Sequence, residues 1–332
     1  MRKIVFALLT GLLSGCAAQF NLPGPPVAAA SLEPDQWRAA DGVVLPMRSW
    51  LPVGKPSAVV LALHGMNDYS NAFDDPGKAL AARGIAVYAY DQRGFGKGPH
   101  PGYWSSGQAM ADDLGQAAEL VAARHPGVPL FLLGESMGGA AVMVTTAYRP
   151  PPQVAGIILS APAVWGRDTM NVFQRAALWL AFQLVPGWEL TGRGLDIHPS
   201  DNIEMLRKLS QDPLVIKSTR TDAIKGLVDL MDAAMAAAPL VRLPALVLVG
   251  EKDEIIPADP TWRTIATLPA IGATQRVALY SKGYHMLLRD LQANTVIDDI
   301  AAWVAAPTRP LPSGADARAD DEMAKRRLSA RG

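Results

Sequence analysis

Short apolar segments recur along the chain, and each is bounded by glycine, proline or charged residues. They are rich in valine, isoleucine, leucine and alanine, and polar residues do not alternate with them. Strands that are apolar throughout are typical of parallel sheets covered on both faces. The segments are residues 58–63, 85–90, 130–133, 154–159, 245–249 and, more weakly, 277–280.

Helical periodicity separates several of these segments. Apolar residues recur at helical spacing over residues 109–124, 138–148 and 287–304. Alternating strands and helices predict an α/β fold, with a mostly parallel central sheet and helices on both of its faces. Residues 37–51 are predicted to add an antiparallel edge.

One interval interrupts the alternation. Residues 161–243 contain no strand-like core segment, although aromatic and aliphatic side chains are plentiful, and residues 171–185 have the pattern of a largely apolar helix. The interval is predicted to be a helical cap inserted above the sheet. It divides the core into a first half, residues 37–160, and a second half, residues 244–305.

The amino-terminal residues 1–16 have the pattern of a secretory signal. Arg2 and Lys3 precede an apolar run that is too short to span a bilayer as a helix. The ending Leu-Ser-Gly-Cys resembles a bacterial lipobox, and its Cys16 is the single cysteine of the chain. We therefore expect a protein of the bacterial cell envelope, lipid-anchored to a membrane through Cys16, and to the outer membrane in a Gram-negative cell. The alternative is an ordinary signal peptide with a coincidental cysteine.

The segments next to the core lack periodicity. Residues 17–36 contain three prolines close together and are predicted to be a tether. Residues 306–332 have few large apolar side chains and are predicted to be a disordered tail.

Composition excludes several partners. The chain carries 31 basic and 31 acidic side chains, so it lacks the positive charge that nucleic-acid binding requires. A single cysteine cannot form an intramolecular disulfide. The sequence shows no metal-ligand cluster and implies no metal and no organic cofactor.

The sequence Gly-Glu-Ser-Met-Gly at residues 134–138 fits the pattern G-x-S-x-G. An apolar strand precedes it and a helix follows it, which is the context of a nucleophile elbow. In such an elbow the serine occupies a strained turn, and side chains in place of the glycines would collide with neighbouring backbone. Ser136 is therefore the predicted nucleophile. The alternative is a structural serine in a glycine-rich turn.

A serine hydroxyl is a weak nucleophile that needs a base, and the base needs an acid to orient it. His198 and His285 are the histidines that follow Ser136. His198 falls inside the predicted cap, whereas His285 follows the last predicted strand, so His285 is the predicted base.

The acid is expected at the end of a core strand, where the backbone is held rigidly. Asp253 follows the strand at residues 245–249 and is the predicted acid. Glu251 and Glu254 are its rivals, and each is more typical of a solvated loop charge.

A tetrahedral intermediate also requires backbone N–H donors for its oxyanion. Met137, directly after the nucleophile, is predicted to supply one donor. Met66, in the loop after the first core strand, is predicted to supply the other. His64 in the same loop is expected to orient that loop rather than to act as a base.

Five motifs occur in order: Leu-His-Gly at 63–65, Tyr-Asp-Gln-Arg-Gly-Phe-Gly at 90–96, Gly-Glu-Ser-Met-Gly-Gly at 134–139, Gly-Glu-Lys-Asp at 250–253 and Gly-Tyr-His at 283–285. Together they resemble the monoacylglycerol lipase and lysophospholipase-like branch of the α/β-hydrolases, a group also labelled serine aminopeptidase S33. The resemblance implies the α/β-hydrolase fold, Ser136, Asp253 and His285 as a catalytic triad, and Met66 and Met137 as oxyanion donors.

Three functions are weighed for this chain. The first is hydrolysis of carboxylic esters of lipophilic acids, with cap aromatics lining an acyl channel: Trp165, Phe173, Trp179 and Phe182. The second is an aminopeptidase-like activity, in which Glu135 or Glu189 holds the substrate ammonium. The third is a catalytically silent surface lipoprotein that uses the fold for binding. The apolar cap favours the first, with a small lipophilic ester as substrate.

Overall fold

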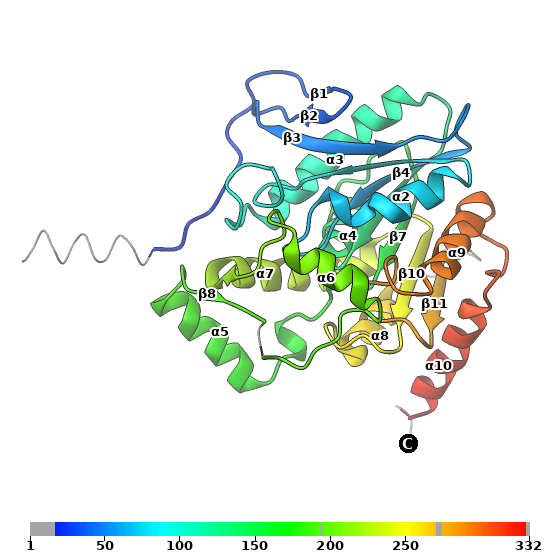
Figure 1. Ribbon diagram of the computed structural model, residues 1–332. Coiled ribbons are helices and arrows are strands. Elements are labelled where there is room, and N and C mark those ends of the chain that lie inside the picture. The colour runs from blue at the N-terminus through cyan, green and yellow to red at the C-terminus, as the bar shows by residue number, and fades with distance from the viewer. Residues whose placement is uncertain (1–16, 193, 270–273, 330–332) are drawn as a thin grey trace, which may run out of the picture.

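The computed structural model describes residues 17–192, 194–269 and 274–329, and its core is a nine-stranded sheet (Figure 1). The strand order is β1-β2-β3-β5-β4-β6-β7-β10-β11. The parallel strands are β4 (Ala58–Leu63), β5 (Ile85–Tyr90), β6 (Leu130–Glu135), β7 (Val154–Ser160), β10 (Ala245–Gly250) and β11 (Arg276–Tyr280). The antiparallel edge is β1 (Ser31–Leu32), β2 (Gln36–Arg38) and β3 (Val44–Trp50).

Burial explains the apolar strand sequences. Every residue of β4, β5, β6 and β10 is buried. Alternate residues of β4 face two separate clusters: Val59 and Leu61 belong to one, and Val60 and Ala62 belong to the other. The predicted parallel strands and the predicted antiparallel edge are both confirmed.

Helices cover both faces of this sheet. The first cluster includes buried side chains of α3 (Gly107–Arg124), α4 (Met137–Tyr148), α7 (Thr221–Ala237) and α8 (Ala258–Thr267). The second includes α2 (Asp74–Ala81) and α9 (Ala293–Ala305). Helix α9 begins later than the predicted helix at 287–304, because the residues after His285 form turns instead.

The interval 161–243 divides into two parts. Helix α5 (Val172–Leu184), β8 (Glu189–Leu190), α6 (Ile203–Gln211) and β9 (Thr219–Arg220) lie outside the core layers, and neither α5 nor α6 has a buried residue. Helix α7 instead packs against α4, with nine buried residues. The part of the interval that stands above the core therefore ends before α7.

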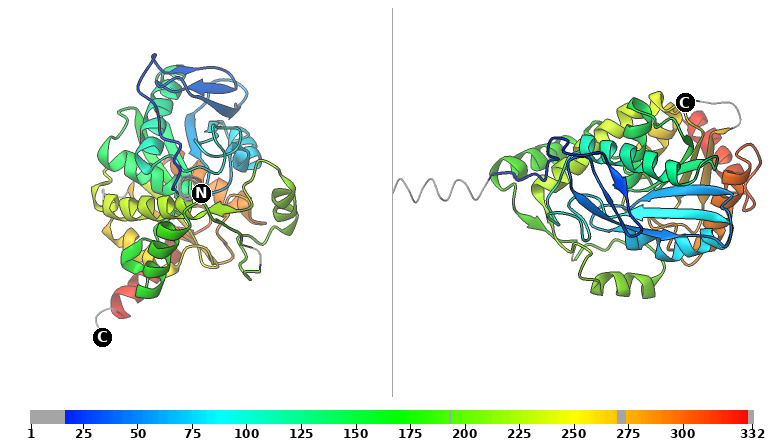
Figure 2. Two further views of the ribbon diagram at one scale, coloured as in Figure 1. Left: turned by 90° about the vertical axis from the view of Figure 1, so that its left-hand side faces the viewer. Right: turned by 90° about the horizontal axis from the view of Figure 1, so that it is seen from above.

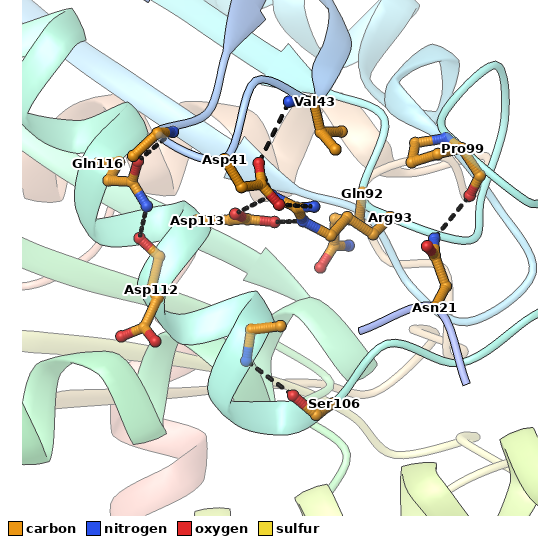
Figure 3. Close-up of polar contacts among 12 residues, drawn as sticks. Asn21, Asp41, Val43, Gln92, Arg93, Pro99, Ser106, Asp112, Asp113 and Gln116 are labelled. Atoms are coloured by element: carbon orange, nitrogen blue, oxygen red, sulfur yellow. Dashed lines mark hydrogen bonds and ion pairs between the residues drawn. The ribbon is translucent and has the colours of Figure 1, made fainter. Parts of the chain in front are cut away.

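The segment 17–36, predicted to be a tether, packs on the core along its described length. The side-chain amide of Asn21 donates to the carbonyl oxygen of Pro99 at 2.8 Å, and the N–H of Gly24 donates to Asp41 at 3.1 Å. Asp41 in turn pairs with the buried Arg93, which also pairs with Asp113 (Figure 3). The prediction was wrong because polar backbone contacts, rather than apolar periodicity, hold this segment.

The prediction of a disordered tail at 306–332 was also wrong. Residues Ala315–Ser329 form α10, which packs against β11 at the edge of the sheet (Figure 1). The small side chains of Ala315 and Ala319 are fully buried. Arg318 donates to the carbonyl oxygen of Leu279 in β11 at 3.0 Å. Two alanines one helical turn apart allow close packing without the large apolar residues that a sequence pattern would reveal.

Removing residues 307–332 should therefore destabilise the protein, because the truncation uncovers β11, which is then an unprotected edge strand. We expect a melting temperature lower by roughly 5 °C or more, together with self-association, measured by calorimetry and light scattering. Leu328→Ala, at a position that is 71% exposed, is the control and should leave both unchanged. A truncated chain that melts like the full chain would show that α10 adds no stability.

Candidate active site

Ser136 occupies a strained turn between β6 and α4. Its φ is 53° and its ψ is −115°, a conformation that costs a residue with a side chain about 1–3 kcal/mol. The flanking glycines have no room for a side chain. A Cβ atom on Gly134 would lie 2.3 Å from the carbonyl oxygen of Gly138, and one on Gly138 would lie 2.3 Å from that of Leu63. The glycines of the motif are therefore required by backbone contacts on both sides of the serine.

Asp253 and His285 form a buried hydrogen bond at the same edge of the sheet. Asp253 follows β10 and His285 follows β11, and their Oδ2 and Nδ1 atoms lie 2.9 Å apart. The side chains are 9% and 7% exposed. The other carboxylate oxygen of Asp253 accepts the N–H groups of Ile255 and Ile256, which fixes its orientation. An ionised carboxylate accepts only, so Nδ1 of His285 is the donor and Nε2 is left as an acceptor.

The rival residues lie outside this pair. Glu254 is exposed, and its carboxylate accepts the backbone N–H of His198 at 2.7 Å. The side chain of His198 is 56% exposed. Glu251 is exposed as well. The side chains of Asp253 and His285 are thus largely buried, whereas the rival residues are exposed.

The loop after β4 lies directly against the serine. A Cβ atom on Gly65 would lie 3.3 Å from the Cβ of Ser136. Met66 follows Gly65, and Met137 is the first residue of α4, where a backbone N–H has no acceptor within its own helix. The N-terminus of α4 also favours negative charge. Met137 therefore follows the serine in the chain, and Met66 follows the glycine that lies against the serine.

His64 orients this loop as a neutral side chain. Its Nε2 accepts the N–H of Gln92 at 3.1 Å, and its Nδ1 lies 2.8 Å from the carbonyl oxygen of Gly65. Complete burial lowers the pKa of His64. With both ring nitrogens engaged, His64 has no atom available as a base, as the sequence analysis expected.

Parallel strand order brings these groups to one edge. β6, β7, β10 and β11 are neighbours and run in the same direction, so their carboxyl ends lie side by side. Ser136, Asp253 and His285 each follow the carboxyl end of one of these strands. Ligands of open α/β sheets bind outside these ends.

Known proteins resemble this chain in sequence and in fold. The sequence profile described as serine aminopeptidase S33 matches residues 54–292. The chain belongs to this family. Its fold is the α/β-hydrolase fold that the sequence motifs predicted.

Relatives of this S33 family chain include lipases. Human monoglyceride lipase is 26% identical over 287 residues, which cover 81% of this chain and 89% of that protein. The monoacylglycerol lipase of Mycolicibacterium smegmatis is 26% identical over 267 residues, which cover 80% and 94%. The crystal structure of the Paleococcus ferrophilus monoacylglycerol lipase superposes with a TM-score of 0.66 at 25% identity, covering 79% of this chain and 99% of that one.

The four aromatic side chains predicted to line an acyl channel differ in their exposure. Phe173 and Trp179 on α5 are 82% and 64% exposed. Phe182 is half-buried under Lys225 of α7, whose Nζ lies 5.0 Å from the ring centroid. Trp165 is partly buried against the main core. Phe173 and Trp179 are thus open to solvent, whereas Phe182 and Trp165 are partly covered by α7 and by the main core.

The cap is tied to the loop that carries Met66. The side-chain amide of Asn67 donates to Thr219 in β9 at 2.7 Å, and the carbonyl oxygen of Asn67 accepts the N–H of Ile216 at 2.9 Å. The hydroxyl of Tyr69 donates to Asp212 at the end of α6 at 2.7 Å. The base of the cap is therefore fixed to the loop beside Ser136.

Cys16, the predicted lipidation site, lies outside the described residues. No described helix has the length and apolar character needed to cross a membrane. Within residues 17–192, 194–269 and 274–329, His, Cys, Asp and Glu side chains do not gather into a group able to hold a metal ion.

The buried carboxyl group of Asp290 makes a contribution to the free energy of unfolding that depends on pH. Its buried carboxylate accepts the N–H of Tyr284 at 2.8 Å and the hydroxyl of Ser200 at 2.6 Å. Burial, together with the nearby carboxylates of Asp201 and Glu135, outweighs these two hydrogen bonds and raises the pKa of Asp290 from 3.8 to about 6. The native protein therefore keeps a proton that the unfolded chain releases between pH 4 and pH 6.

This linkage predicts that the contribution of Asp290 to the free energy of unfolding falls as the pH rises from about 4 to about 6. Asp290→Asn removes the titration. The free energy of unfolding is measured by urea titration at pH 4.5 and pH 6.5. It should fall more for the wild-type protein than for the variant between these two pH values. Equal pH dependence of the two proteins would contradict the assignment.

Proposed function

We propose that this chain is a serine hydrolase that cleaves carboxylic esters of lipophilic acids through an acyl-enzyme intermediate. The observation that carries the proposal is the buried hydrogen bond between Asp253 and His285, at the sheet edge where Ser136 occupies its strained turn. A carboxylate that orients a histidine at the same sheet edge as an elbow serine is the arrangement that acyl transfer requires.

In the first step, Nε2 of His285 takes the hydroxyl proton of Ser136 while Oγ of Ser136 attacks the ester carbonyl carbon. Asp253 stabilises the resulting imidazolium. The N–H groups of Met66 and Met137 donate to the oxyanion of the tetrahedral intermediate. The intermediate collapses, His285 protonates the leaving alcohol, and the acyl group remains bonded to Oγ.

In the second step, water replaces the alcohol. His285 removes a proton from the water molecule, whose oxygen attacks the acyl carbonyl carbon. Collapse of the second tetrahedral intermediate releases the carboxylic acid and returns the proton to Ser136 Oγ. These steps need no metal and no organic cofactor.

The names of the relatives support a lipophilic acyl group. Two of them are monoglyceride or monoacylglycerol lipases that align along about four fifths of this chain. The apolar side chains of α5, among them Phe173 and Trp179, supply a surface suited to a lipid-like substrate.

An aminopeptidase activity, which the family description includes, has less support. Such an enzyme needs a free carboxylate to bind the substrate ammonium. Glu135 is 3% exposed and pairs with Arg289, and Glu189 is hydrogen-bonded to Ser218 at the surface. The strained turn at Ser136 likewise favours an enzyme over a silent binding protein, because strain of this kind concentrates at functional sites.

Hydrolysis of a 4-nitrophenyl ester series from acetyl to palmitoyl tests the proposal, with protein that lacks residues 1–16. We expect activity to rise toward medium or long chains. Ser136→Ala should lower kcat by roughly 10⁶-fold, because the nucleophile is lost. Ser49→Ala, which changes an exposed serine of β3, is the matched control and should retain activity. Activity retained by Ser136→Ala would refute the proposed nucleophile, and activity confined to acetyl esters would refute the lipophilic substrate.

We further propose that acyl chains on Cys16 anchor the enzyme to a membrane of the bacterial cell envelope, the outer membrane in a Gram-negative cell. The described chain begins beside the cap (Figures 1 and 2), where the N–H of Gln19 donates to Asp222 at the start of α7. Phe20, Leu22 and Trp188 are exposed in this region. An anchor attached here holds the apolar side of the cap near the lipid surface that would supply the substrate.

Cys16→Ser in the full chain should abolish incorporation of a radiolabelled fatty acid and release the enzyme from the membrane fraction. Its ester hydrolysis in detergent should stay unchanged, since Cys16 is not part of the reaction. Fatty-acid labelling that persists in the variant would refute the anchor and leave the proposed reaction untouched.

A further inference from the structure

Arg289 lies buried between two carboxylates beside the proposed triad. Its Nη1 is 2.7 Å from Asp68 Oδ2, and its Nη2 is 2.8 Å from Glu135 Oε1. The three side chains are 8%, 9% and 3% exposed. One guanidinium group therefore binds two carboxylates at once, away from solvent.

The three residues come from three different segments of the site. Asp68 lies in the loop after β4 that also carries Met66. Glu135 is the last residue of β6 and directly precedes Ser136. Arg289 lies four residues after His285. The guanidinium thus connects the oxyanion loop, the nucleophile and the base.

The backbone around His285 transmits the position of Arg289. The N–H of Arg289 donates to the carbonyl oxygen of Met286 at 2.8 Å. Asp290 accepts the N–H of Tyr284 at 2.8 Å, which closes the turn on the other side of His285. Because these bonds make residues 284–290 one compact turn, a shift of Arg289 displaces the imidazole.

Asp68 is similarly fixed to its own loop. Its Oδ1 accepts the N–H of Tyr69 at 2.9 Å, and its N–H donates to the carbonyl oxygen of Gly65, the glycine that touches Ser136. The second arm of Arg289 therefore holds the loop that packs on the serine.

We propose that Arg289 is a positioning residue of the reaction, which sets the distance between His285, Ser136 and the oxyanion loop. This inference rests on the proposed hydrolase function. Arginine suits the role because its planar guanidinium presents several N–H donors in fixed directions, whereas a lysine ammonium is a single compact group on a flexible stem. A displacement of about 1 Å in such a site can slow a reaction by roughly 10²-fold.

Arg93 provides a matched control, because it lies in the loop after β5, outside the three segments that Arg289 connects. It too is a buried arginine between two carboxylates, Asp41 and Asp113, with both nitrogen–oxygen distances at 2.7 Å and 3% of its side chain exposed (Figure 3). Its partners tie the amino-terminal segment to α3. Replacing Arg93 therefore disturbs a comparable ion pair, and neither Arg93 nor its two carboxylates bonds to the loops that carry Met66, Ser136 and His285.

The test compares Arg289→Lys with Arg93→Lys on one 4-nitrophenyl ester, with melting temperature, kcat and KM measured for each. The rate at which a fluorophosphonate labels Ser136 is the second readout. We expect Arg289→Lys to lower kcat and the labelling rate by about 10-fold or more, with KM changed less than about 3-fold. Arg93→Lys should lower the melting temperature by a similar amount and keep kcat within 2-fold of wild type.

A kcat for Arg289→Lys within 2-fold of wild type would overturn the inference, as would an equal loss of kcat in Arg93→Lys. If Arg289→Lys does not fold, Asp68→Asn and Glu135→Gln decide the question, because each keeps an acceptor and weakens one arm. Each should lower kcat by about 3-fold or more, and wild-type kcat in both would refute the role. Inactive wild-type protein would refute the proposed hydrolase instead.

Discussion

Crowding between β4 and the turn at Ser136 is the constraint on which the rest of the site depends. Helix α4 starts so close to β4 that a Cβ on Gly138 would lie 2.3 Å from the carbonyl oxygen of Leu63. Ser136 must then adopt a positive φ for the chain to pass from β6 into α4. The strain is sustained because β6 is fully buried and paired on both edges, with β4 and β7. A rigid sheet interior thus maintains a turn that an isolated peptide would relax.

The other groups of the site reach this turn on loops, and polar bonds hold those loops together. His64 fixes Gly65, Asp253 fixes His285, and Arg289 connects Asp68 with Glu135. Buried ion pairs of this kind add little to the free energy of unfolding, because the cost of desolvation offsets much of their attraction. Their value here lies in geometry: each bond joins segments that are distant in the sequence and adjacent at the sheet edge.

The sequence predicted the features that depend on local pattern. The parallel strands follow from uninterrupted apolar segments, and the nucleophile turn follows from glycines around Ser136. His198 and Glu254, which the sequence pattern set aside, are both exposed. Arg289 escaped prediction because its partners lie 154 and 221 positions away along the chain. Helix α10 escaped because alanines and ion pairs, rather than large apolar side chains, hold it on β11.

The same limit applies to the cap aromatics. A helical pattern in residues 171–185 predicts an apolar face but does not say what the face contacts. In the structure the base of the cap is anchored: Met286 donates to the carbonyl oxygen of Pro199, and Asn67 bonds to both Thr219 and Ile216. Helix α5 has no buried residue and rests on α7. Lifting the base of the cap would therefore pull on the loops that hold Met66 and His285.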